Sequence, residues 1–268
     1  MILFVFEGAD REPDIFRTLE RLFFTHPSEE QEKIVIYKYG TSFHSLYNNL
    51  NKKGMGLLEH LRDKAASNKN VKLKENYEDF LRYREKDFSE IFLFFDYDFH
   101  FKQMSLSQWN EHLETLLSYF DNETENGKLY ISYPMVESIR YTKKMPDNAF
   151  YTYCVKRSDC MKQKGKRDSG FKYMASSFSD YKGLSFIQWD GMEEHRDEVK
   201  QNWENLKFQN VAKANFICNG VNEIPEKKEA VSQSVVFAKQ VNKYVNCDEC
   251  CVSILNAFPL FLFEYFKL

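Results

Sequence analysis

The sequence predicts an α/β fold in which an open, mainly parallel sheet is flanked by helices. Apolar runs of four or five residues alternate with helix-type patterns in the first half of the chain. These runs lack polar alternation, as expected of strands covered on both faces. Only 10 Gly and 6 Pro occur among 268 residues, which disfavours a turn-dense β sandwich.

Strand and helix patterns follow one another through the first half. The run from Ile2 to Phe6 predicts a buried strand, and Pro13 is suited to the first turn of the helix that follows. In order, the predicted elements are strand 2–6, helix 13–24, strand 34–37, a mainly helical stretch over 43–83, strand 91–95, helix 106–120, strand 128–132 and a helix from 135 to 141. This order predicts one α/β domain over residues 1–145.

The second half, residues 146–268, is predicted to be a mainly helical region. A basic, strand-poor stretch over 156–172 is followed by helix patterns at about 192–205, 208–217, 227–244 and 249–266. The last of these is too apolar to be left in water, so we expect it to form core. A homodimer interface is the alternative.

Composition excludes several classes of protein. The 37 basic and 40 acidic residues give a net charge of -3, unlike a polybasic nucleic-acid binder. The first apolar run ends at Glu7 without a basic lead, and the run over 258–263 is about half the length of a bilayer span. The expected location is therefore the cytoplasm, without a membrane segment.

The six cysteines are expected to be reduced thiols in that compartment. Cys247 and Cys250 have CxxC spacing, which is half of a zinc site. A complete site would need a second pair, and Cys154 and Cys160 are not spaced as one. Free thiols are the simpler interpretation, and zinc remains the alternative.

Three predicted strands lead into acidic residues. Glu7-Gly8 ends the first strand, Asp96 and Asp98 end the third, and Glu137 follows the fourth. Because the carboxyl ends of parallel strands share one edge of a sheet, these carboxylates should gather there. Gathered carboxylates repel one another unless a cation lies between them, and their hard oxygens suit Mg²⁺ or Mn²⁺.

A hydrophobic strand that ends in Glu-Gly, with a later one that ends in Asp-x-Asp, resembles the Toprim domain of topoisomerases, primases and overcoming-lysogenization-defect (OLD) nucleases. The resemblance covers roughly residues 1–145. It implies that Glu7 matches the conserved glutamate and that Asp96 and Asp98 match the metal-binding aspartates.

OLD-like nucleases carry a second acid a few residues after Glu-Gly, for which Asp10 and Glu12 are the candidates. Glu12 fits better, because Glu12-Pro13 opens the helix. Glu137 resembles the later acid that helps to hold a second metal ion. The segment 133–139 also looks like stand-alone Toprim proteins of bacterial phage defence (abortive infection), which often work beside an ABC-type ATPase.

The resemblance implies a nuclease in which Glu7, Asp96, Asp98 and Glu12 or Glu137 hold Mg²⁺ or Mn²⁺, with Glu7 as ligand or general base. Lys166 is the candidate catalytic cation. His100 could contact a metal-bound water or a phosphate. The predicted contacts to the nucleic-acid backbone are Lys156, Arg157, Lys162, Lys164, Lys166, Arg167 and Lys172.

Two other classes of function remain open. Phosphatases of the haloacid-dehalogenase type and metal-dependent glycosyltransferases also place Asp-x-Asp after an apolar strand, but they leave Glu7-Gly8 unexplained. The second of these classes is a non-catalytic interaction subunit, in which the acids bind a structural ion or none.

Overall fold

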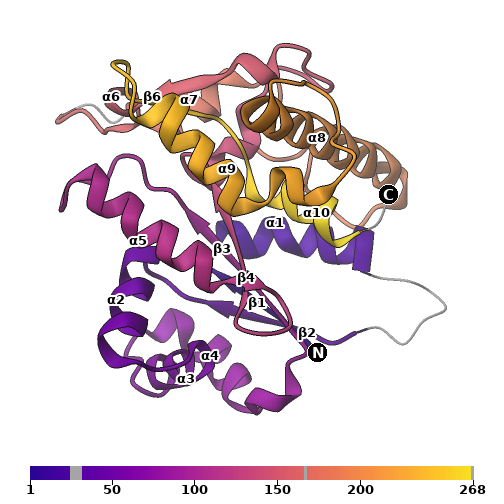
Figure 1. Cartoon of the computed structure of the whole chain (residues 1–268). Helices are drawn as coiled ribbons and strands as arrows, with labels where there is room; N and C mark the ends of the chain where they lie inside the picture. Colours follow the sequence, from indigo (N-terminus) through magenta and orange to yellow (C-terminus); the bar gives the residue numbers. More distant parts are fainter. Residues whose placement is uncertain (25–31, 166–167, 267–268) are drawn as a thin grey trace. The chain divides into compact units, whose positions relative to one another are not determined.

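The computed structural model describes residues 1–24, 32–165 and 168–266 (Figure 1). The chain forms two compact units. The first comprises residues 1–95 and 104–130, and the second comprises residues 96–103 and 131–268. The predicted α/β class is confirmed, whereas the predicted domain boundary at residue 145 stays a prediction.

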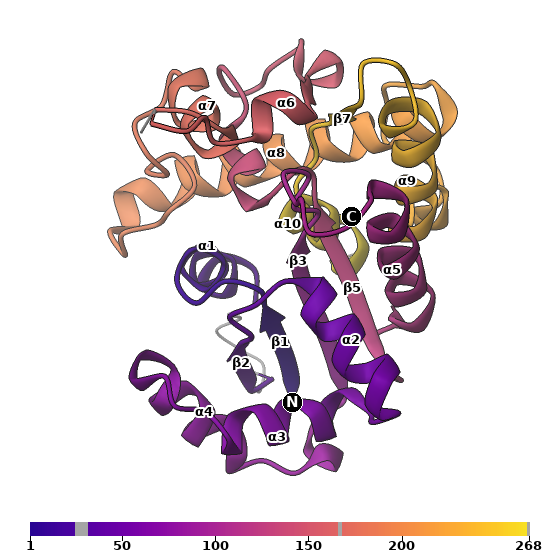
Figure 2. The same ribbon diagram turned by 90° about the vertical axis from the view of Figure 1, so that its left-hand side faces the viewer.

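The strands of the described chain include a five-stranded sheet in the order β2-β1-β3-β5-β4. Figure 2 shows β2, β1, β3 and β5 of this sheet. Its members are β1 (Ile2–Phe6), β2 (Ile34–Lys38), β3 (Glu90–Asp96), β4 (Asp121–Asn122) and β5 (Gly127–Ser132). β1 is parallel to both β2 and β3, while β4 is antiparallel to β5. The four predicted strands are confirmed; β4, only two residues long, was not predicted.

The register of β1 and β3 determines where both strands end. Phe6 lies opposite Phe94, so the two strands finish at the same edge of the sheet. Between them, Phe4 is fully buried, with its ring centroid 4.1 Å from that of Phe16 and 5.3 Å from that of Phe92. This aromatic core explains the high Phe content and holds the strand ends firmly.

Helices occupy the rest of the first unit. They are α1 (Arg11–Leu19), α2 (Phe43–Lys53), α3 (Leu57–Ala66), α4 (Lys74–Leu81) and α5 (Leu106–Tyr119). A π-helical turn extends α1 to Phe24. Gly54, with φ of +63°, ends α2, and Ser105 with Gln108 forms a capping box that starts α5.

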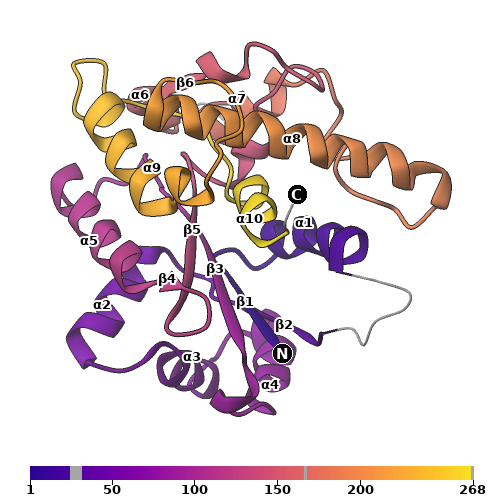
Figure 3. The same ribbon diagram turned by 45° about the vertical axis from the view of Figure 1, so that its right-hand side comes forward.

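In the second unit, α8 (Glu193–Asn219) and α10 (Ala257–Tyr265) pack against each other (Figure 3). The sequence predicts two helices where α8 is one. Nothing between residues 205 and 208 breaks it, and it ends at Gly220, where φ is +80°. The predicted helix over 249–266 is wrong at its start, since β7 (Cys251–Ser253) pairs with β6 (Cys154–Lys156) before Asn256 caps α10.

Shorter helices of this unit include a 3₁₀ turn over Val136–Arg140 in place of the predicted helix, α6 (Arg157–Cys160), α7 (Phe171–Phe178) and α9 (Gln233–Gln240). Within the described ranges, no helix has both the length and the apolar character needed to cross a membrane.

Lys213, in α8, is a fully buried lysine. The Nζ atom of Lys213 donates to the carbonyl oxygen of Tyr153 at 2.5 Å and lies 4.7 Å from the ring centroid of Phe150. The side chain is fully buried. Burial lowers the pKa of Lys213 to about 7.

Candidate metal centre

Glu7 is the first residue after β1, and backbone hydrogen bonds hold it on both sides. Its amide donates to the carbonyl of Phe94 at 2.9 Å, and its own carbonyl accepts from the amide of Gly40 at 2.8 Å. The side chain is half-buried. The β1–β3 pairing thus continues one residue beyond the strand and sets the position of the Glu7 backbone.

Gly8 is required because the Glu12 carboxylate lies against its backbone. Its amide donates to the Oε1 atom of Glu12 at 3.1 Å. A Cβ atom at Gly8 would lie 2.2 Å from the Oε2 atom of the same carboxylate. The buried Glu12 side chain therefore folds back onto the Glu-Gly corner, which only a residue without a side chain permits.

Gly8→Ala is expected to displace the Glu12 carboxylate and break its hydrogen bond to the backbone, lowering the free energy of unfolding by about 1–3 kcal/mol. Urea denaturation measures the loss. Gly56→Ala is the matched control, because nothing lies within 4 Å of a Cβ there and φ is negative. Equal effects of the two substitutions would contradict this role of Gly8.

The Asp-x-Asp segment is held by backbone pairing with the residues after β5. Asp96 is the last residue of β3, and its Oδ1 atom accepts from the amide of Val136 at 2.7 Å. The amide of Asp98 donates to the carbonyl of Pro134 at 3.0 Å. Asp98 has φ of +52°, a left-handed conformation that is uncommon outside glycine and clusters at functional sites.

The three acids that carry the sequence prediction come together. One carboxylate oxygen from each of Glu7, Asp96 and Asp98 lies within 4.8 Å of the other two. The grouping follows from the strand register, because Glu7 bonds to Phe94 and Asp96 lies two residues further along the same strand. Within residues 1–24, 32–165 and 168–266, no other group of three or more acids, histidines or cysteines lies close enough together to hold a metal ion.

Glu12 and Glu137 lie outside this group of three. Glu137, in the 3₁₀ turn after β5, has a side chain only 6% exposed, and its Oε1 atom lies 3.2 Å from the Nζ atom of Lys172. The assignment of Glu12 and Glu137 as further metal ligands stays a prediction.

The electrostatic surroundings of Asp98 disfavour its charged form. Burial raises the pKa of Asp98, and the negative charge of Glu137 raises it further, while His100 and Lys172 oppose the shift. The Nδ1 atom of His100 lies 3.8 Å from the Oδ1 atom of Asp98. A divalent cation would relieve this unfavourable charge more strongly than a single histidine or lysine can.

Arg157, predicted as a phosphate contact, is used within the protein. Its guanidinium donates to the carbonyl oxygens of Phe99, at 3.1 Å, and Phe101, at 2.6 Å. These carbonyls belong to the loop directly after Asp98, so Arg157 braces the segment that carries the second aspartate. Only the charge of Arg157 could be read from the sequence, because the bracing role depends on contacts with residues 56 and 58 positions away.

Some of the other basic residues predicted to contact nucleic acid are paired with acids of the chain, and others are exposed to solvent. Lys156 forms an ion pair with Glu249 at 3.4 Å, and Lys172 pairs with Glu137. Lys162 and Lys164 are exposed. Lys166, the candidate catalytic cation, and Arg167 lie outside the described residues.

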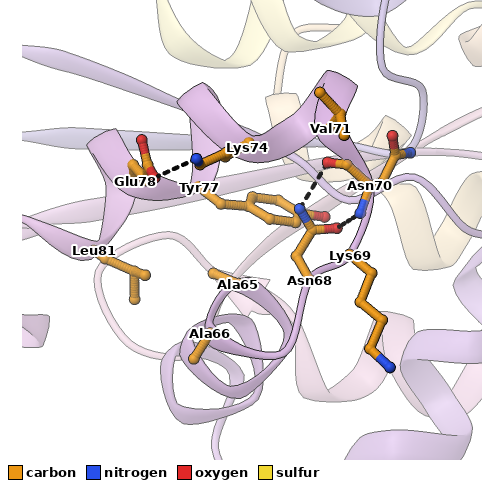
Figure 4. A pocket seen from close by; sticks show the side chains of 10 residues that line it. All are labelled: Ala65, Ala66, Asn68, Lys69, Asn70, Val71, Lys74, Tyr77, Glu78 and Leu81. Carbon is orange, nitrogen blue, oxygen red and sulfur yellow. Dashed lines mark hydrogen bonds and ion pairs between the residues drawn. The ribbon is translucent and has the colours of Figure 1, made fainter.

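A surface hollow of the first unit lies between α3 and α4 (Figure 4). Its lining side chains are aliphatic, amide and aromatic, together with Lys69 and an ion pair of 3.7 Å between Lys74 and Glu78. None of the site residues predicted from the sequence is among them. The hollow therefore offers no grouped acids comparable to those at the strand ends.

The chain was also compared with known proteins. No protein-family model, curated protein or solved structure gives a significant match. Its function is therefore to be inferred from the chemistry of the acidic site.

Proposed function

We propose that this chain is a divalent-metal-dependent nuclease with a Toprim-like catalytic domain. One observation supports it above the others: carboxylates at the ends of two paired parallel strands, Glu7 after β1 and Asp96 and Asp98 at the end of β3, offer oxygens within 4.8 Å of one another. The open edge of a parallel sheet is where α/β enzymes gather reactive groups.

Mg²⁺ or Mn²⁺ would be held by Glu7, Asp96 and Asp98, and when bound it supplies charge stabilisation and activation of water. The Oδ1 atom of Asp96 accepts a hydrogen bond from the Val136 amide, and this bond orients the second carboxylate oxygen, Oδ2. Lys172 and His100 place positive or proton-donating groups beside Asp98. These groups suit a substrate that carries phosphate.

The proposed substrate is DNA, tRNA or another RNA, and Lys162 and Lys164 are exposed in the basic stretch that would contact its backbone. The proposed setting is an antiviral, abortive-infection system in the cytoplasm. There a toxic effector would be restrained by an ABC-type ATPase partner until infection.

Supercoiled plasmid and total tRNA, incubated with the purified chain in Mg²⁺, Mn²⁺ or EDTA, test the proposal. We expect metal-dependent cleavage of one polymer, lost in Glu7→Ala and Asp96→Ala. If the chain needs its partner, expression in cells replaces the purified assay, and wild type is expected to be toxic where Glu7→Ala is not.

Two results would overturn the proposal. Cleavage that persists in both variants would place the chemistry elsewhere. Absence of cleavage together with absence of toxicity would favour the non-catalytic interaction subunit, while metal-dependent release of phosphate from a small ester would favour the phosphatase class.

A further inference from the structure

Two histidines of the first unit join α2 to α5. The Nδ1 atom of His44, in the first turn of α2, lies 2.9 Å from the Nδ1 atom of His112 on α5. The Nε2 atom of His44 lies 2.8 Å from the side-chain nitrogen of Asn48, one turn further along α2. The ring of Tyr47 stacks on that of His112, with 3.8 Å between the centroids. Contacts from α2 thus fix the orientation of both imidazole rings.

The bond between the two Nδ1 atoms holds a single proton. An imidazole nitrogen donates a hydrogen bond when it is protonated and accepts one when it is not. Because the amide nitrogen of Asn48 donates to Nε2 of His44, the proton of neutral His44 lies on Nδ1 and is donated to His112. The pair can carry one positive charge with this bond intact. Two imidazolium rings, however, would place a proton on each Nδ1 atom and leave no acceptor.

The surroundings of His112 also disfavour a charge on its ring. Burial lowers the pKa of His112, and the negative charge of Glu111, on the same helix, opposes this shift. From α2, the groups that contact the ring are His44 and the aromatic ring of Tyr47. A charge on His44 would repel a second charge on His112 across the short bond.

We propose that His44 and His112 form a pH-sensitive latch that holds α2 against α5 and opens when both imidazoles are protonated. Phe43 and Trp109, the core residues next to the pair, are buried, and their ring centroids lie 4.2 Å apart. Opening of the latch would therefore separate two helices that share a part of the apolar core.

The latch is also connected to the backbone that holds Glu7. Gly40, three residues before α2, donates its amide to the carbonyl of Glu7 at 2.8 Å. When α2 is released, we expect this hydrogen bond to open more often. This expectation concerns the backbone alone and does not depend on the proposed nuclease activity.

The sign of the pH dependence follows from the protons that each state holds. Below about pH 6.5, the usual pKa of histidine, the unfolded chain carries two protons on these rings, whereas the latched fold carries one. The stabilisation is therefore present above this pH and is lost as the pH falls below it. The unfolding constant of the wild type should rise by up to about tenfold per pH unit from this cause.

Urea denaturation in EDTA, from about pH 7.5 to pH 5, measures this dependence. His112→Phe keeps a ring beside Tyr47 but cannot titrate, so its unfolding constant should rise by up to about tenfold less per pH unit than that of the wild type. His195→Phe is the control, because His195 is an exposed histidine of the second unit whose pKa is raised by its hydrogen bond to Asp190. Its removal should not flatten the pH dependence.

Nuclear magnetic resonance of the wild type gives a second measurement that needs no variant. We expect His44 and His112 to titrate in two separate steps, the second well below about pH 6.5. Protection of the Gly40 amide from hydrogen exchange should fall with the second step, while that of the Tyr133 amide, bonded to Leu255 in the second unit, should not. Independent titration of both histidines near their usual pKa, or an unchanged pH dependence in folded His112→Phe, would overturn the latch.

Discussion

Asp98→Asn is expected to slow metal-dependent cleavage by at least about 100-fold and, in EDTA, to raise the thermal midpoint of unfolding. The first effect follows from loss of one of three grouped carboxylates. The second follows from burial, which raises the pKa of Asp98. Asparagine also tolerates the left-handed backbone of this position, with φ of +52°.

The sign of the stability effect is set by linkage. A carboxyl whose pKa is raised in the folded state contributes stability that is present below its unfolded pKa and is lost as the pH rises through the folded pKa. At pH 7 the charged Asp98 therefore destabilises the fold, and Asn removes this cost. Each kcal/mol regained raises the midpoint by about 2–4 °C, and the gain should vanish below about pH 4, where the carboxyl is neutral in both states.

Differential scanning fluorimetry at pH 7 and at low pH, with EDTA or Mn²⁺, measures these effects. Asp121→Asn, an exposed aspartate of β4, is the matched control and should change neither the midpoint nor the cleavage rate. A lower midpoint for Asp98→Asn in EDTA, or cleavage at the wild-type rate, would contradict the account of this residue.

Lys213→Met is expected to raise the free energy of unfolding by about 1–3 kcal/mol at pH 7. Charging a buried lysine whose pKa is lowered to about 7 costs stability. Methionine removes that cost but also the contact with the Phe150 ring and the hydrogen bond to Tyr153. The Tyr153 carbonyl keeps a partner, because it also accepts from the amide of Ile254 at 3.0 Å.

The pH dependence of the free energy of unfolding distinguishes removal of the buried charge from a change in side-chain packing. Between about pH 7 and pH 10 the unfolded chain holds a proton on Lys213 that the folded chain lacks, so the stability of the wild type rises with pH. The advantage of methionine should therefore shrink toward pH 10. Urea denaturation of the wild type and Lys213→Met from pH 7 to pH 10 measures this change. Lys200→Met, on the exposed face of the same helix, is the control. If the two free energies of unfolding differed by the same amount at every pH, the buried charge would be excluded as the cause.

The acidic site could be predicted because it depends on local pattern and on one general property of parallel sheets. Continuous apolar runs identified β1 and β3, and each run ended directly in acids. Once the strands are parallel neighbours, Glu7 and Asp96 must meet at the same edge. No contact distant in sequence had to be known beyond that pairing.

The roles of the basic residues could not be predicted in the same way. Arg157 and Lys172 read from the sequence as surface charge, yet Arg157 binds the carbonyls after Asp98 and Lys172 pairs with the buried Glu137. Both contacts join segments at least 35 residues apart. Charge alone does not show whether a lysine or arginine faces solvent or another part of the chain.

The structure of residues 249–266 also could not be predicted from the local sequence pattern alone. An apolar stretch from 249 to 266 reads as one helix, but its first part forms β7 because β6 offers a partner strand about 100 residues earlier. A three-residue strand carries too little periodicity to be recognised. The same pairing places Cys154 opposite Ser253, which the cysteine spacing could not show.

Mn²⁺ binding to the purified chain, followed by electron paramagnetic resonance, shows whether Glu7, Asp96 and Asp98 form a metal centre, since it needs neither substrate nor partner. We expect saturable binding to the wild type that Glu7→Gln weakens at least about tenfold and that Glu125→Gln, at an exposed turn, leaves unchanged. Equal affinities of wild type and Glu7→Gln would contradict a metal centre formed by Glu7, Asp96 and Asp98.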